Sequence, residues 1–263
     1  MTDPMLETGG NPRVSIVTIV WNNRAFIADA IESVLAQTYP NIEYIVKDGG
    51  STDGTLKVIE RYRGRIAKVL TGKDKGLYDA MNTGMQAASG DIIMHLNADD
   101  LYAGTDAVAS LVQAMQESGA DAAWGDIVYV DRKDAAKIVR RWRSSPHAPG
   151  KFRTGWHPPH SGFSVRRAVY EKYGWFDPSF RISADYELML RFLEKEGVSS
   201  CYVPKTIVKM RTGGVSGGFL ARLSKIRRED LRAWRRNGLR GGLLASFLKP
   251  LSKIPQLFHG PER

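Results

Sequence analysis

Between residues 13 and 130 the sequence alternates short apolar runs with segments whose apolar residues recur at helical spacing. The apolar runs, rich in β-branched residues, are 13–21, 42–48, 66–70, 91–97 and 122–130. The intervening segments predicted to be helices are 24–38, 55–65, 77–89 and 106–119. Because parallel neighbours in a sheet need a crossover helix, this alternation predicts an α/β fold with a mostly parallel sheet flanked by helices.

The composition suits a soluble globular enzyme or binding protein. A chain of 263 residues with 43% hydrophobic and 25% charged residues can bury one large core. The single cysteine, Cys201, excludes an internal disulfide framework and suits a reducing compartment, where we expect it to be a small buried side chain. We find no apolar signal region and no apolar run near the ~20 residues of a membrane span. We therefore expect a cytoplasmic protein, with peripheral contact to the inner face of the cytoplasmic membrane.

The positive charge is concentrated at one end of the chain. Residues 219–263 hold eleven Lys or Arg against three Asp or Glu, a net charge of +8, whereas the whole chain carries +10. A nearly neutral main body argues against nucleic-acid binding. The pattern predicts a basic amphipathic helical tail that lies on an anionic membrane. Packing of the tail on a partner or on the domain itself is the alternative. Residues 1–12, polar and with two prolines, predict a loose N-terminus.

Polar side chains follow the predicted strands where each strand ends. Asn22 follows the first, Asp48 ends the second, and Asn97, Asp99 and Asp100 follow the fourth. In open parallel sheets ligands bind outside the carboxyl ends of the strands. Clustered carboxylates repel one another and lose hydration, so a positive group is expected among them. A hard dication such as Mn²⁺ or Mg²⁺, bridging one carboxylate to a diphosphate, satisfies that requirement.

Several nucleotide and metal motifs are absent from the sequence. The stretch "GGSTDG" is not the G-x-G-x-x-G of dinucleotide-binding folds, and no P-loop motif occurs. Neither H-E-x-x-H nor paired C-x-x-C is present, which excludes zinc sites of those kinds. A nucleotide site, if present, is therefore of another type.

Two long stretches resemble glycosyltransferase family 2, whose members have the GT-A fold. They are "VSIVTIVWNN…AIESVLAQTYPNIEYIVKDGGSTDGT" and "DKGLYDAMNTGMQAASGDIIMHLNADD". The resemblance implies a GT-A domain over 13–218, with a nucleotide-binding half (13–105) and an acceptor half (106–218). It also implies inverting transfer of a sugar from a nucleoside-diphosphate-sugar. "DKGLYDAMN" is similar to a subset from bacterial polysaccharide and lipopolysaccharide clusters, which implies a glycan or lipid-linked acceptor.

The resemblance assigns contacts with the nucleotide sugar to nine positions: Thr18, Asn22, Asp48, Gly50, Asp79, Asn82, Asn97, Asp99 and Asp100. Thr18 and Asn22 are implied to line the nucleotide pocket, and Asp48 to read the base. Asp79 and Asn82 are implied to approach the ribose and diphosphate. Asn97 stands where the family commonly has the first Asp of its D-x-D motif. That leaves Asp99 as the expected metal ligand and Asp100 as its neighbour.

The second half, "WHPPHSGFSVRRAVYEKYGWFDPSFRISADYELMLRFL", is similar to the acceptor region of the family. An inverting transfer needs a base for the acceptor hydroxyl, and Asp185 is our candidate. Glu187, two residues along the same predicted helix, is expected to point away. His157 and His160 are weaker candidates for the acceptor or the metal, and Arg211 for neutralising the diphosphate on a glycine-rich lid. Two other readings stay open: a nucleotidyltransferase of sugar metabolism, and a non-catalytic nucleotide- or glycan-binding module.

Overall fold

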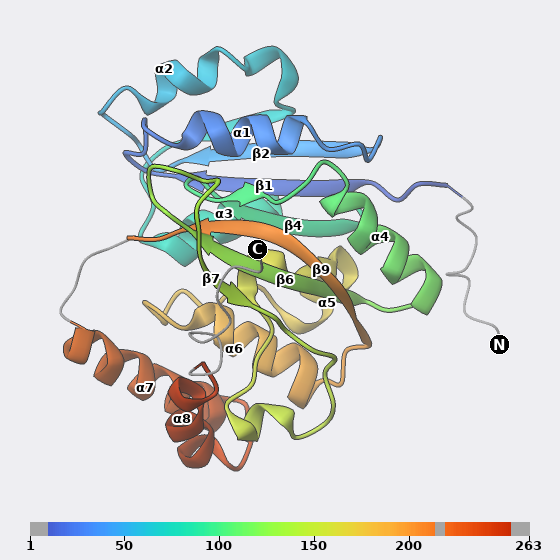
Figure 1. The fold of residues 1–263 in the computed structure, drawn as a ribbon, viewed down its shortest axis with the longest axis vertical. Helices are drawn as coiled ribbons and strands as arrows, with labels where there is room; N and C mark the ends of the chain where they lie inside the picture. Colours follow the sequence, from blue (N-terminus) through green and yellow to red (C-terminus); the bar gives the residue numbers. More distant parts are fainter. Residues whose placement is uncertain (1–9, 214–218, 254–263) are drawn as a thin grey trace.

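The computed structural model in Figure 1 describes residues 10–213 and 219–253, with the backbone alone described for 219–223. Among these residues a single sheet holds nine strands in the order β3-β2-β1-β4-β8-β6-β9-β5, with β7 paired to β6. The strands are β1 (Val14–Val20), β2 (Ile42–Asp48), β3 (Lys68–Thr71), β4 (Ile92–Asn97), β5 (Leu101–Tyr102), β6 (Ala122–Val130), β7 (Ile138–Trp142), β8 (Ser164–Arg166) and β9 (Ser200–Arg211).

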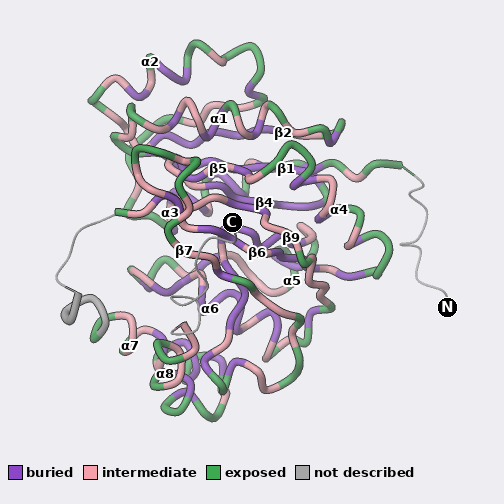
Figure 2. Tube along the Cα trace, in the orientation of Figure 1, coloured by how far each residue is buried: buried purple, intermediate pink, exposed green. Residues whose placement is uncertain are grey.

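Helices cover both faces of this sheet. The α-helices are α1 (Ile27–Leu35), α2 (Thr55–Glu60), α3 (Leu77–Gln86), α4 (Ala107–Ser118), α5 (Arg167–Tyr173), α6 (Ala184–Leu190), α7 (Phe219–Arg236) and α8 (Gly242–Leu251). The shorter ones are the 3₁₀ turns η1 (Arg63–Arg65), η2 (Lys151–Thr154) and η3 (His160–Gly162), and the π-helix η4 (Arg191–Lys195). Residues of α1, α2 and α4 share one apolar cluster, and residues of α3, α5 and α6 share another on the opposite face. Figure 2 shows the central strands buried between these layers.

The predicted α/β fold is confirmed. Strand β1 is buried along its whole length and pairs in parallel with both β2 and β4. The register sets Val20 opposite Asp48 and Ile19 opposite Asn97, and Asp48 pairs in turn with Thr71 of β3. The carboxyl ends of the first four strands therefore meet at one edge, where the polar residues were expected.

Three details differ from the sequence-based expectation. Strand β8 runs antiparallel between β4 and β6, and β7 forms an antiparallel hairpin with β6, so the sheet is mixed. Helix α1 begins at Ile27, later than predicted, because the Asn23 carbonyl accepts the N–H groups of Phe26 and Ile27 in a turn. Helix α2 ends at Glu60 and is followed by η1, which shortens the predicted helix 55–65.

Helices α7 and α8 pack against the acceptor half (Figure 1). Ala233, Trp234 and Ala245 are buried in the same cluster as Tyr186 of α6, and the Trp234 indole N–H donates to the Tyr186 hydroxyl at 2.9 Å. The Glu229 carboxylate of α7 accepts three consecutive backbone N–H groups from residues 181–183. Helix α7 is therefore integral to the folded body. Within the described residues, none of the helices combines the length and apolar composition that a bilayer crossing requires.

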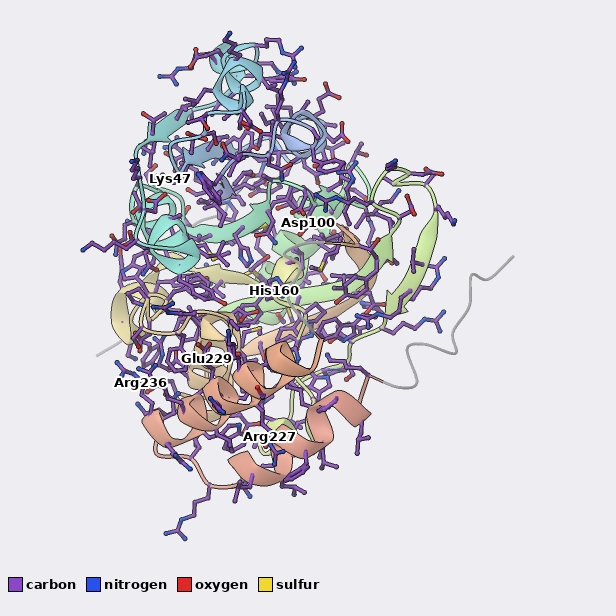
Figure 3. All side chains as sticks on the ribbon, turned by 90° about the vertical axis from the view of Figure 1, so that its left-hand side faces the viewer. Lys47, Asp100, His160, Arg227, Glu229 and Arg236 are labelled. Atoms are coloured by element: carbon purple, nitrogen blue, oxygen red, sulfur yellow. The ribbon has the colours of Figure 1, made fainter. Side chains whose placement is uncertain are left out.

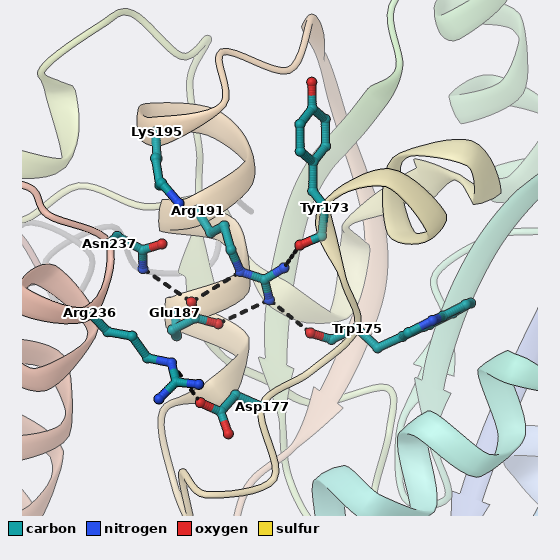
Figure 4. A pocket seen from close by; sticks show the side chains of 8 residues that line it. All are labelled: Tyr173, Trp175, Asp177, Glu187, Arg191, Lys195, Arg236 and Asn237. Atoms are coloured by element: carbon teal, nitrogen blue, oxygen red, sulfur yellow. Dashed lines mark hydrogen bonds and ion pairs between the residues drawn. The ribbon is translucent and has the colours of Figure 1, made fainter.

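A small polar cavity of about 280 Å³ marks the junction between α6 and α7 (Figure 4). Glu187 is buried there and accepts hydrogen bonds from Arg191 and Asn237, as Figure 4 shows. Arg191 also donates to three backbone carbonyls of residues 173–175, and Arg236 pairs with Asp177 at 3.0 Å. These charges partner one another, so we assign this cavity a structural role. Glu187 thus turns away from the sheet edge, toward α7.

Candidate active site

Asp48, at the end of β2, builds the loop that follows it. Its carboxylate is fully buried and accepts the N–H groups of Gly50 and Ser51 at 3.0 and 2.9 Å and the Ser51 hydroxyl at 2.5 Å. Gly50 has φ +86°, a conformation that favours glycine. Asn22, after β1, joins the same loop because its side-chain oxygen accepts the Thr52 N–H at 2.8 Å. Asp48 and Asn22 thus shape the mouth of the first two strands, while base reading by Asp48 stays a prediction.

Three other residues that were expected to contact the sugar donor form hydrogen bonds with groups of the protein itself. The Thr18 side chain is buried in the core and accepts a hydrogen bond from the Tyr44 hydroxyl at 3.1 Å. Asp79 accepts the Lys75 N–H at 2.8 Å and so fixes the loop before α3. The Asn82 amide pairs with both backbone groups of Phe176, at 2.8 and 3.1 Å. Asn82 therefore clamps α3 to the acceptor half, and the ribose and diphosphate contacts of Asp79 and Asn82 stay predictions.

The two carboxylates of the acidic turn after β4, Asp99 and Asp100, differ in how deeply they are buried. Asp100 is buried and accepts hydrogen bonds from the Asn97 amide at 3.0 Å and the Arg211 N–H at 3.3 Å. Burial, with the charge of Asp99 beside it, raises the pKa of Asp100 to about 7. Asp99 is more open: its side chain is 27% exposed, and its carboxylate lies 3.8 Å from the Arg132 guanidinium. Asp99 is thus the carboxylate that a ligand can reach.

Arg211 lies at the centre of this edge. It is the last residue of β9, outside any loop, and it is buried. Its guanidinium donates to the Asp29 carboxylate at 2.5 Å and to the Asp99 carbonyl at 3.1 Å. The glycine-rich lid we expected after it falls mostly on residues 214–218, outside the described residues.

Two arginines at this edge retain hydrogen-bonding capacity. The guanidinium groups of Arg132 and Arg211 both lie against the ring of Phe26, at 4.6 and 4.8 Å from its centroid. Within the described residues, Nη1 of Arg132 and Nε of Arg211 are buried without a hydrogen-bond partner. Phe26 and Arg132 also line an open pocket of about 530 Å³ with residues 22–25 and Asp53. Buried N–H groups without partners are costly, and an anion such as a diphosphate satisfies them.

The donor set at this edge fits a divalent cation only incompletely. Within the described residues no group of three or more His, Cys, Asp or Glu side chains is arranged to hold a metal. Asp99 offers an accessible carboxylate, whereas Asp100 beside it is buried, and that burial raises its pKa. Asp99 can therefore hold Mn²⁺ or Mg²⁺ together with diphosphate oxygens, which are the hard ligands these ions prefer.

Two residues near the first strand ends were not assigned a role from the sequence. Trp21 directly follows β1 and is 69% exposed beside Gly49, so its indole is free to stack on a planar ligand. Lys47 is buried and donates to the carbonyls of Asp48 and Gly72 and to the Asp74 carboxylate at 2.7 Å. Its charge fixes the loop after β3 against the end of β2. The sequence did contain a sign that Lys47 is buried, because it lies within the apolar run of the second strand.

Asp185, the candidate base, is held by two side chains. It lies in the first turn of α6, and its carboxylate is 26% exposed. The Tyr78 hydroxyl donates to one oxygen at 3.2 Å and to the Ile182 carbonyl at 2.7 Å. The His160 ring lies 3.5 Å from the other oxygen. Burial and the Asp185 charge raise the pKa of Tyr78, so its phenol stays a donor.

His95 links this group to the acidic turn. It lies two residues before Asn97 on β4, and its ring stacks on His160 with centroids 6.0 Å apart. Burial, with a contribution from His160, lowers the pKa of His95 to about 3, so the ring is neutral. Its Nε2 has no partner among the described residues. His95 was missed from the sequence, although it is the one polar residue within "IIMHL".

His157 is placed apart from His160. It is buried, its Nδ1 lies 2.9 Å from the Pro158 carbonyl, and its ring packs edge-on against Trp142 and Tyr186. Burial, with the charges of two nearby lysines, lowers its pKa. The structure thus brings His160, but not His157, into contact with Asp185.

The chain is similar in sequence to several known proteins. Residues 15–174 match the protein family described as glycosyl transferase family 2. An uncharacterized glycosyltransferase of Mycobacterium tuberculosis is 35% identical over 183 residues, which are 68% of each chain. A PGL/p-HBAD biosynthesis glycosyltransferase of Mycobacterium bovis is 25% identical over 231 residues, covering 84% of this chain and 88% of the relative.

Solved structures show the same fold. TarS 1–349 of S. aureus aligns with a TM-score of 0.67 and 16% identity, over 92% of this chain and 72% of that one. A mannosyltransferase from Pyrobaculum calidifontis, solved with GDP-Man and Mn²⁺, aligns with a TM-score of 0.65 and 18% identity, over 95% of this chain and 74% of that one. TarS 1–349 has also been solved with UDP-GlcNAc. Because the sequence identities are this low, the structural similarity establishes the GT-A-like fold alone.

Proposed function

This chain belongs to glycosyltransferase family 2, and we propose that it transfers a sugar from a nucleoside-diphosphate-sugar, with inversion, to a glycan or lipid-linked acceptor. The family membership decides against the two readings left open by the sequence, a nucleotidyltransferase and a non-catalytic module. The proposal further places the enzyme in the cytoplasm and in cell-surface polysaccharide biosynthesis. A relative named for PGL/p-HBAD biosynthesis supports a biosynthetic role.

One observation carries the mechanism: the Asp185 carboxylate, held by Tyr78 and His160, is joined through His95 to the strand that ends at the acidic turn. A base for the acceptor hydroxyl and a binding site for the leaving diphosphate thus meet at one sheet edge. Inverting transfer needs that arrangement, because the acceptor oxygen attacks in line with the departing diphosphate.

The donor side supplies charge stabilisation. Arg132 and Arg211 both lie near Asp99, and each has one N–H group without a hydrogen-bond partner within the described residues. These groups can donate to a diphosphate bound there, which gains negative charge as it leaves. A divalent ion held by Asp99 supplies further positive charge to the diphosphate when bound. The exposed indole of Trp21 offers the nucleobase a stacking surface.

The acceptor side supplies the proton acceptor. The two oxygens of Asp185 are oriented by Tyr78 and by His160, so the carboxylate presents a fixed lone pair to the acceptor hydroxyl. The neighbouring His160 can stabilise the carboxylate before the proton arrives.

Two measurements test this proposal. Thermal-shift screening against UDP-, GDP-, dTDP- and CMP-sugars, with and without Mn²⁺, should give one donor class that raises the melting temperature. Slow hydrolysis of that donor, followed by NMR, should first release the anomer opposite to that of the donor. Release of the donor's own anomer would contradict inversion, and a chain that no nucleotide sugar stabilises would contradict the proposal as a whole.

A further inference from the structure

Helix α8 presents an uncovered apolar face. Leu243, Leu244, Phe247 and Leu251 are 64, 55, 56 and 55% exposed. Their spacing places all four within about 100° of the helix circumference. The opposite face is packed: Ala245 and Ser246 are buried, and a Cβ on Gly242 would lie 2.7 Å from Trp234. The outward apolar face is therefore not needed to hold α8 on the enzyme.

Helix α7 behaves differently. Its buried apolar residues within 224–236, Ala233 and Trp234, pack in the cluster of α6, so the apolar side of this part of the helix is already covered. The two acidic residues of α7 also face inward. Asp230 is buried and pairs with Lys249 at 2.8 Å, while Glu229 caps the backbone of residues 181–183.

The surroundings of the apolar face of α8 are basic. The Arg227 guanidinium lies 3.7 Å from the centroid of the Phe247 ring. Arg153 lies beside the first turn of α8, since a Cβ on Gly241 would be 3.1 Å from its Cγ. Arg240, exposed, precedes that turn in the chain. With both acidic side chains of α7 turned inward, arginines border the leucines, and no carboxylate of α7 or α8 accompanies them among the described residues.

We propose that this face of α8, defined by Leu243, Leu244, Phe247 and Leu251, docks on an anionic lipid surface. Apolar side chains of a surface helix enter the boundary between headgroups and acyl chains, while neighbouring arginines pair with lipid phosphates. A nucleic acid uses the arginines but has no place for four aliphatic and aromatic side chains. An apolar face bordered by Arg153, Arg227 and Arg240 is a poor match for a second copy of itself, because like charges would meet.

Docking through α8 bears on the acceptor proposed above. Lys249, on the packed face of α8, lies 3.8 Å from the centroid of the Tyr186 ring, and Tyr186 directly follows Asp185. Figure 3, viewed from the side of the strands' carboxyl ends, shows Arg227 and Glu229 below His160 and Asp100. A bilayer bound at the outward face of α8 is therefore separated from α6, the helix that carries the candidate base, only by α8 itself. This step rests on the proposed function and favours a lipid-linked acceptor.

The test is vesicle co-sedimentation of the full chain. Phosphatidylcholine vesicles containing phosphatidylglycerol should bind the protein, and pure phosphatidylcholine vesicles should bind it weakly. Phe247→Glu should raise the lipid concentration for half-maximal binding at least about tenfold, the expected result of removing one large apolar contact and adding a repelled charge. Val139→Glu, at an equally exposed apolar residue of β7, is the matched control and should bind like the wild type.

Equal binding of wild type and Phe247→Glu to anionic vesicles would overturn the proposal. Light scattering would overturn it in favour of a second copy if the wild type forms a dimer that Phe247→Glu dissociates. Binding to duplex DNA without binding to vesicles would overturn it in favour of a nucleic acid. Hydrolysis of the soluble donor should be unchanged in Phe247→Glu, so failure of vesicle binding is distinguishable from failure of the proposed transfer.

Discussion

Glu43 of β2 connects β1, β3 and the segment before β4, and the carboxyl ends of these strands form the candidate site. Removal of its charge should lower the free energy of unfolding. Glu43 is buried on β2, where its carboxylate accepts the Ser15 hydroxyl of β1 at 2.5 Å. It also accepts the N–H and hydroxyl of Ser89, before β4, at 2.7 and 2.9 Å, and pairs with Lys68 of β3 at 3.0 Å. Glu43→Gln keeps the shape of the side chain but removes the charge that these donors stabilise.

The pKa of Glu43 sets the size of this effect. Burial alone would raise it, but the hydrogen bonds from Ser15, Ser89 and Lys68 lower the pKa from 4.5 to about 2. Each unit corresponds to about 1.36 kcal/mol, so the charged form contributes about 3 kcal/mol to the free energy of unfolding. Because the folded pKa is depressed, this contribution is complete above pH ~4.5 and is lost as the pH falls toward ~2. By pH ~3.5 about 1.4 kcal/mol of it is gone.

Urea denaturation of wild type and Glu43→Gln between about pH 7 and pH 3.5 measures this effect directly. The difference in free energy of unfolding should be about 3 kcal/mol at neutral pH and should shrink by about half at the acid end. Glu60→Gln is the control, since Glu60 is 59% exposed and pairs with Arg63 at 3.7 Å, and it should change stability by less than about 1 kcal/mol. A difference that stays constant with pH would refute the assignment of this energy to the Glu43 charge.

Three further predictions concern the active site. Trp21→Ala should weaken donor binding by about tenfold or more in calorimetry, since stacking on a base contributes about 1–3 kcal/mol; an unchanged Kd would remove Trp21 from the nucleotide site. Tyr78→Phe should lower kcat about tenfold at unchanged donor Kd, because it frees one Asp185 oxygen; an equal rise in Kd would instead indicate a structural role. Chelation of divalent ions should raise the donor Kd of the wild type but leave that of Asp99→Asn unchanged, and equal sensitivity of both proteins would exclude Asp99 as the ligand.

The strand–helix alternation was sufficient to predict strands β1 to β4. Each of these strands is an apolar run followed by a polar turn, so the aligned ends at Asp48 and Asn97 followed from the rule for parallel sheets. Strand β8 could not be predicted in the same way. It has three residues, and its place between β4 and β6 is decided by contacts with both neighbours, not by its own sequence.

The contacts within the candidate site could not be predicted from the sequence. The family resemblance assigned roles to Asp99, Asp185 and Arg211, which stay predictions. It did not show that the Asn82 amide pairs with the backbone of Phe176. Such pairings join residues far apart in the sequence, and local patterns carry no information on them. The tail shows the same limit: helical periodicity identified its apolar residues, but only packing separates the covered face of α7 from the open face of α8.

We propose that Asp185 acts as the base and that the acidic turn binds the donor, and one paired measurement tests these two roles most directly. Donor affinity and nucleotide release should be determined on the same preparation of Asp185→Asn. We expect release to fall at least about 100-fold, the usual contribution of a positioned base, with the donor Kd within about twofold of the wild type. Release at the wild-type rate, or loss of donor binding together with activity, would contradict the assignment of Asp185 as the base.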